Sequence, residues 1–180
     1  MQAKFSRLAV LLLVCVIGFG SINSLAGSGQ IQFKRPKDAD PLLENPQTFG
    51  KSREEMMDLI KQTLKDMEIP LDEKRTTEQT GMLYTRPVIF TKGGPSGENL
   101  EFVSRRPGGQ LRNWTRGRYT LQIEVAPVDP QRIKLFVFAQ IEGEYQDDAL
   151  GAKWVACPSR GVIESNTLQA FKDRMGEQQP

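Results

Sequence analysis

Histidine is absent from this sequence of 180 residues, and cysteine occurs only twice. Without histidine the chain lacks serine–histidine and cysteine–histidine catalysis, histidine-ligated zinc or haem, and the commonest general base. Two cysteines are too few for a four-thiolate metal site. We therefore expect no metal, no cofactor and no catalytic residue, and we interpret the protein as a non-enzyme that acts by binding.

The excess of positive over negative charge is also small: the chain has 24 Lys and Arg and 22 Asp and Glu, which gives a net charge of +2. Both excess cations, Lys4 and Arg7, lie at the extreme N-terminus, where no acid accompanies them. The rest of the chain is balanced, so it has no basic arm. We do not expect nucleic acid as a partner.

Residues 1–26 are predicted to be a secretory signal peptide. The apolar run Leu8 to Gly20 follows the short cationic start and is shorter than the ~20 residues that span a bilayer. Ser24 and Ala26 place small residues three and one before a cut that leaves Gly27 first. We expect a periplasmic or secreted protein whose signal peptide contacts the membrane only during export.

Two alternatives would leave the protein associated with a membrane. The signal could be retained as an anchor, or Cys15 could carry a lipid, although the bulky Val14 before it disfavours lipid attachment. Removal after Ala26 leaves Cys157 alone. We interpret Cys157 as a buried small hydrophobe, with an intermolecular bridge or a reactive thiol as the alternatives.

The mature chain divides into a flexible lead-in at 27–50, a single domain at 51–176 and a tail at 177–180. The lead-in contains three prolines and shows little periodicity. A helix begins at the capping box Ser52-Arg53-Glu54-Glu55 and stops before Pro70. Its apolar residues recur at helical spacing: Met56, Leu59, Ile60, Leu64 and Met67.

The clearest strands follow later in the chain. Apolar residues alternate with polar ones over 119–125 and again over 133–141, and a Pro-rich turn at 127–130 separates the two runs. This pattern predicts an antiparallel pair with one buried face. Phe136 and Phe138 fall on the opposite face of the second strand.

Three further segments complete the prediction. Residues 92–113 are expected to be irregular, with a short strand over Asn99–Val103. The Gly93-Gly94-Pro95-Ser96-Gly97 run lacks the lysine of a phosphate loop and a following helical pattern, which argues against a nucleotide site. Residues 142–157 are expected to form an acidic loop ending in a short strand, before a final helix over residues 160–175.

These elements predict an α+β domain. An antiparallel sheet with one buried face needs a cover, and one helix from each end of the domain can supply it. We therefore expect a two-layer sandwich in which an antiparallel sheet of about four to five strands is covered by an N-terminal and a C-terminal helix, in a helix-grip-like arrangement.

Several short motifs resemble the helix-grip domain of the outer-membrane assembly lipoprotein BamC and its relatives. They are the first helix, Ile69-Pro-Leu-Asp, Thr80-Gly-Met-Leu-Tyr-Thr, and Ser159-Arg-Gly-Val-Ile-Glu164 before the closing helix. The resemblance covers roughly residues 52–175. It implies a non-enzymatic envelope protein that acts through protein contacts, with structural roles for the matching Gly81, Gly161 and Glu164.

The most unusual local composition lies at 104–118, which has five arginines, one tryptophan and no acid. Arginine binds carboxylates and phosphates bidentately, and tryptophan stacks on guanidinium groups or fills a partner's pocket. We predict a contact surface for an envelope protein, an anionic lipid or a polymer, made of Arg105, Arg106, Arg112, Trp114, Arg116 and Arg118. In the alternative, these arginines pair with the domain's own acids at residues 142–148.

Three other interpretations remain open. Asn113-Trp114-Thr115 matches the N-glycosylation pattern, and the acids at 142–148 could hold calcium, although they lack the spacing of a calcium loop. The alternative function is carriage of a small apolar ligand or lipid, in a cavity between sheet and helix lined by Phe136, Phe138 and Trp154.

Overall fold

The computed structural model describes residues 42–105, 107, 113–147 and 149–177. The expected signal peptide and residues 27–41 lie outside this range. The elements in chain order are β1 (Gln47–Phe49), α1 (Arg53–Asp66), the 3₁₀ helix η1 (Glu78–Thr80), β2 (Met82–Tyr84), β3 (Val88–Lys92), α2 (Ser96–Val103), β4 (Trp114–Asp129), β5 (Arg132–Asp147), β6 (Gly151–Cys157) and α3 (Val162–Glu177).

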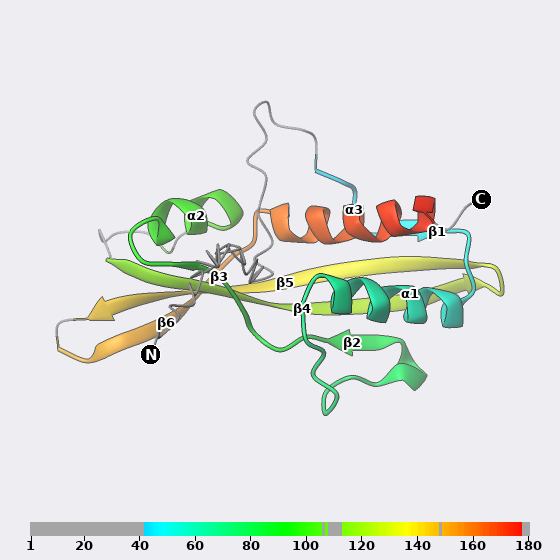
Figure 1. The fold of residues 1–180 in the computed structure, drawn as a ribbon, viewed down its shortest axis with the longest axis horizontal. Helices are drawn as coiled ribbons and strands as arrows, with labels where there is room; N and C mark the ends of the chain where they lie inside the picture. Colours follow the sequence, from blue (N-terminus) through cyan, green and yellow to red (C-terminus); the bar gives the residue numbers. More distant parts are fainter. Residues whose placement is uncertain (1–41, 106, 108–112, 148, 178–180) are drawn as a thin grey trace, which may run out of the picture.

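One antiparallel sheet of six strands is built around the long β4–β5 hairpin. On one side of this hairpin β2 and β3 pair with β4, and on the other side β1 and β6 pair with different parts of β5. Figure 1 shows α1 and α3 alongside one half of the hairpin and α2 at the other end, near β6. The expected α+β class with an antiparallel sheet is confirmed, with six strands instead of four to five and with a third helix.

The sheet has an inner face that is almost fully buried. Alternate residues of β4 and β5 point into the core: Tyr119, Leu121, Ile123, Val125, Ile133, Leu135, Val137 and Ile141. The predicted alternation therefore holds along both strands, because a strand places successive side chains on opposite faces. Burial of this apolar row is the main source of the domain's stability.

All three helices bury apolar residues in the same core cluster. The capping box of α1 is present, since the Glu55 amide donates to the Ser52 hydroxyl and the Ser52 amide donates to the Glu55 carboxylate. α1 buries Met56, Leu59 and Ile60, and α3 contacts both α1 and β5. Within the residues that the structure describes, no helix is long and apolar enough to cross a membrane.

The end of the expected lead-in belongs to the sheet. β1 pairs with β5 through Gln47↔Leu135 and Phe49↔Ile133, and Phe49 is buried. This differs from the expected flexible segment at 27–50. The periodicity of three residues is too short to be recognised in a sequence, and the partner strand lies more than eighty positions away along the chain.

The prediction of irregular chain and a short strand at 92–103 was wrong. The glycine-rich run leads directly into α2, with Gly93 at φ 76° and the Ser96 amide donating to the Gly93 carbonyl. Leu100 and Val103, three positions apart, share the buried side of this helix. With only eight residues, α2 offers too few turns for a clear helical period.

The prediction of an acidic loop from residue 142 was also wrong, whereas the short strand expected at its end lies within β6. β5 continues to Asp147, and β6 pairs with it through Ile141↔Cys157 and Asp147↔Gly151. Glu142 and Glu144 alternate with the inward-facing Ile141 and Tyr145 along β5, so they lie on the opposite face of the strand. Glu144 and Glu142 each form an ion pair with an arginine of β4, and these ion pairs neutralise the two carboxylates on the strand.

Candidate binding surface

The side of the sheet opposite the core carries two of the predicted contact residues, Arg116 and Arg118, and we call it the outer face. From β4 and β5 it comprises Arg116, Arg118, Thr120, Gln122, Glu124, Lys134, Phe136, Phe138, Gln140, Glu142 and Glu144. Every one of these side chains except Glu144 retains contact with solvent. The outer face is therefore available to a partner along most of the hairpin.

At one end of the outer face lies an arginine–tryptophan cluster, formed by Arg116, Arg118, Glu142, Glu144 and Trp154. The register of the sheet places Arg116 opposite Glu144 and Arg118 opposite Glu142. Arg116 donates to both carboxylate oxygens of Glu144, from Nε at 2.6 Å and from Nη2 at 2.5 Å. Arg118 Nε lies 2.7 Å from Glu142 Oε2.

Glu144 is only 4% exposed, so its carboxylate depends on protein groups for hydrogen bonds. The hydroxyl of Thr115 adds a hydrogen bond of 2.8 Å to Oε2. The hydrogen bonds from Arg116, assisted by Thr115, lower the pKa of Glu144 despite its burial, and they raise the pKa of Arg116. This pair is a fixed, charge-neutral part of the sheet.

The indole ring of Trp154, on β6, contacts the guanidinium groups of both arginines. Arg118 lies 4.1 Å and Arg116 5.5 Å from the centre of its indole ring. Cation–π contacts of this geometry hold arginine side chains in place. Arg116 keeps 47% of its side chain exposed, so the ordered cluster still presents guanidinium surface to a partner.

An aromatic patch occupies the other half of the outer face and consists of Met82, Tyr84, Phe136 and Phe138. The register aligns Tyr84, Gln122 and Phe138 in one row, and Met82, Glu124 and Phe136 in the next. The rings of Phe136 and Phe138 are near-parallel with centres 6.3 Å apart, and Phe138 is 46% exposed. An exposed aromatic side chain of this kind is a candidate anchor for a protein contact.

Trp114, by contrast, is not on this surface. It is 6% exposed and packs edge-on against Tyr145 with ring centres 5.8 Å apart. Two glycines opposite each other in the register, Gly117 and Gly143, leave space for the surrounding rings. A Cβ at Gly143 would lie 2.5 Å from the indole of Trp114. The structure therefore corrects the expectation that Trp114 contacts a partner.

The other predicted contact residues lie in different environments. Arg105 is exposed, while Arg106 and Arg112 lie outside the described residues. Arg116 and Arg118 pair with Glu144 and Glu142, which confirms for these two arginines the alternative that they neutralise the domain's own acids. Their binding role stays a prediction, and the structure restricts it to the guanidinium surface that the glutamates leave free.

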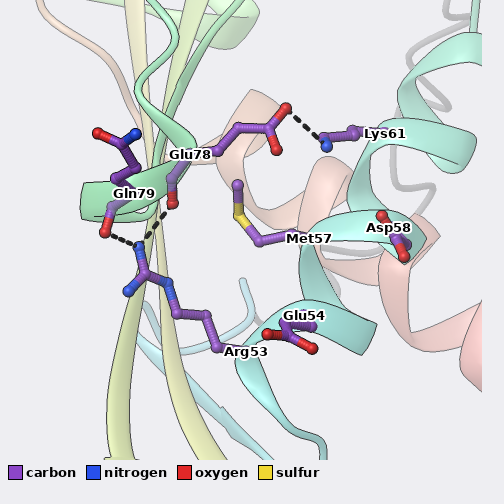
Figure 2. A pocket seen from close by; sticks show the side chains of 7 residues that line it. All are labelled: Arg53, Glu54, Met57, Asp58, Lys61, Glu78 and Gln79. Atoms are coloured by element: carbon purple, nitrogen blue, oxygen red, sulfur yellow. Dashed lines mark hydrogen bonds and ion pairs between the residues drawn. The ribbon is translucent and has the colours of Figure 1, made fainter.

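A groove between α1 and η1 has a volume of about 460 Å³ and is lined mainly by charged residues. Figure 2 shows two kinds of contact across it: Arg53 donates to the backbone carbonyls of Glu78 and Gln79, and Lys61 pairs with Glu78 at 2.7 Å. These contacts attach η1 to α1. We interpret the groove as structural.

Phe136, Phe138 and Trp154, the residues expected to line a ligand cavity, are side chains of the outer face instead. The groove of Figure 2 and a second one between β1 and the end of α3 are lined by other residues. Cys157 is buried, which agrees with its interpretation as a small hydrophobe.

Three of the acids considered as calcium ligands serve other partners, and the fourth, Asp148, lies outside the described residues. Glu142 and Glu144 bind arginines, and Asp147 accepts hydrogen bonds from the amides of Ala149 and Leu150 in the β5–β6 turn. In the described part of the chain, no three acidic or thiol side chains form a group able to hold a metal ion.

The sequence interpretation missed Trp154 and Tyr84 as surface residues, and it named the acids at 142–148 as partners of the arginines only as an alternative and without assigning the pairs. One usable signal was present. A glycine inside a strand marks a close approach of neighbouring groups, and both Gly117 and Gly143 interrupt runs of larger residues. The register that aligns Arg116 with Glu144 had no local signal.

Comparison with known proteins adds no relationship: the sequence matches no family model and no curated protein.

Proposed function

We propose that this chain is an exported, non-enzymatic binding protein, a cell-envelope or outer-membrane assembly or scaffold factor that acts by protein–protein contact. One observation carries the proposal: the outer face combines half-exposed aromatic side chains with arginines on an ordered sheet. Trp, Tyr and Arg contribute most of the binding energy at protein interfaces. The resemblance to the BamC-like family gives the same class of function.

The helix-grip arrangement belongs to the same proposal. In it, α1 and α3 lie together on the inner face and leave the outer face to partners. The contacts of α1 with β4 and of α3 with β5 and α1 support this arrangement.

The test is site-specific photo-crosslinking in intact cells. A photoreactive residue replaces Gln140, which is exposed on the outer face, and in a matched control it replaces Gln169, which is exposed on α3. We expect a discrete protein adduct from position 140 that mass spectrometry identifies as an envelope protein. Equal adducts from both positions, or none from position 140, would contradict the proposal.

A further inference from the structure

The outer face carries an excess of positive charge. Two cations join those of the hairpin, because Lys92 of β3 is the register partner of Arg116 and the Arg75 guanidinium lies 4.4 Å from the centre of the Tyr84 ring. Over residues 42–177 the two signs are nearly balanced, so the excess is a property of this surface. Between the rows of Arg116 and Lys134, the charged side chains are the cations Arg75, Lys92, Arg116, Arg118 and Lys134 and the carboxylates Glu124, Glu142 and Glu144.

Three of these cations are available to a partner. Arg116 and Arg118 are paired with glutamates of β5. The other three, Lys92, Lys134 and Arg75, are exposed and form no ion pair with any acid that the structure describes. A carboxylate that approaches an unpaired cation gains attraction without displacing an existing partner.

The unpaired cations are spread along the whole length of the hairpin. Arg75 lies at the aromatic patch through its contact with Tyr84. Lys92 lies at one end, beside the arginine–tryptophan cluster, and Lys134 lies beyond the patch at the other. About ten residues of β4 separate their rows, which at ~3.4 Å per residue gives about 34 Å. This spacing suits an extended segment with acids along its length and apolar side chains between them.

The position of one carboxylate favours a protein segment over a lipid surface. Glu124 lies in one row with Met82 and Phe136, inside the aromatic patch. An anionic membrane presents negative charge over the whole contact, so it would also cover Glu124 with like charge. A polypeptide can place its acids opposite the cations and an uncharged group opposite Glu124, and such complementarity gives specificity.

We propose that the outer face binds an acidic, extended segment of a protein partner, whose carboxylates pair with Lys92, Lys134 and Arg75 and whose apolar side chains contact the aromatic patch. This inference rests on the proposed function, because it states the chemistry of the partner for the same face. Charge pairing sets the position of the segment, and burial of Phe138, which is 46% exposed, contributes affinity.

Fluorescence anisotropy of the purified protein tests the inference with a labelled twelve-residue peptide in which glutamate and leucine alternate. The lysine–leucine peptide is the control probe. We expect the glutamate peptide to bind at least tenfold more tightly, with an affinity that falls as salt is added. The double variant Lys92→Glu/Lys134→Glu should weaken its binding at least tenfold.

A matched double variant separates the outer face from the net charge of the protein. Lys65→Glu/Lys172→Glu makes the same change of charge at exposed positions of α1 and α3, and it should alter the affinity less than twofold. All four lysines are exposed, so melting curves should stay close to that of the wild type. Equal affinity for the two peptides, or equal losses in both double variants, would overturn the inference.

A lipid partner would give a different result. Binding to phosphatidylcholine vesicles that contain phosphatidylglycerol, without a preference for the glutamate peptide, would overturn the inference. The cellular crosslink from position 140, on which the proposed function depends, does not rely on either probe. In that adduct the partner's crosslinked segment should be rich in Asp and Glu, and a segment without an excess of acids would overturn the inference while the proposed function stands.

Discussion

The carboxylate of Glu164, on α3, accepts a hydrogen bond of 3.2 Å from the backbone amide of Ala139 on β5. Ala139 lies between the parts of β5 that pair with β1 and with β6. The same carboxylate accepts a hydrogen bond of 2.8 Å from the Ser159 hydroxyl. Glu164 therefore replaces part of a missing strand at this edge and ties α3 to the sheet.

Replacing Glu164 by Gln should destabilise the domain by about 1–2 kcal/mol, because the amide oxygen can serve only one of the two donors well. Chemical denaturation measures this loss. Glu73→Gln is the control, since Glu73 is exposed, and it should change stability by less than about 0.5 kcal/mol. Equal stability of both variants would show that the Ala139 contact contributes little.

Asn45 binds the same edge of β5 two residues away, at Val137. Its side-chain amide donates to the Val137 carbonyl, and its oxygen accepts from the Val137 amide at 3.1 Å. Asn45→Ala should cost about 1–3 kcal/mol, because both backbone groups lose a partner.

Asn45→Asp should cost at least as much at neutral pH, since the carboxylate faces the Val137 carbonyl. The difference in stability between Asn45→Asp and Asn45→Ala should become smaller as the pH falls towards the ordinary Asp pKa of about 3.9, because the protonated acid can donate a hydrogen bond to the Val137 carbonyl. Denaturation at several pH values follows this change. An aspartate variant as stable as the wild type at neutral pH would contradict the assigned contacts.

Gly143→Ala should destabilise the core by about 1–3 kcal/mol, because the new methyl group would overlap the Trp114 ring. The loss should be smaller in a Trp114→Phe background, so a double-mutant cycle measured by thermal unfolding gives a positive coupling. Gly94→Ala is the control: nothing lies within 4 Å of its Cβ position, and its stability should match that of the wild type.

The ion pair between Arg116 and Glu144 should appear in the pH dependence of stability. The pKa of Glu144 is lowered in the folded state, so its contribution is complete above the unfolded carboxyl value of about 4.3. The contribution is lost as the pH falls below that value and through the lowered folded pKa.

The melting temperature of Glu144→Gln should therefore lie several degrees below that of the wild type at pH 7, and the two should converge in acid. Thermal melts from pH 7 down to the acid limit of folding measure the difference. A constant gap over the whole range would mean that the charge of Glu144 does not matter, and Glu73→Gln should follow the wild type throughout.

Local patterns in the sequence predicted the elements that local forces form. The capping box and the apolar spacing from Met56 onward identified α1, and alternation identified the middle of β4 and the first part of β5, including the outward position of Phe136 and Phe138. The turn expected at 127–130 begins later, because β4 continues to Asp129. These signals depend on residues one to four positions apart, which is the range over which helix and strand geometry repeats.

The composition and the local patterns by themselves determined the α+β class, the buried face of the long hairpin and the lack of histidine chemistry. Tertiary structure alone decided that Trp114 is buried and that Arg116 and Arg118 neutralise Glu144 and Glu142, because these contacts join residues more than twenty positions apart through strand register. Register is fixed by the packing of whole strands against the core, and no short segment of the chain encodes it.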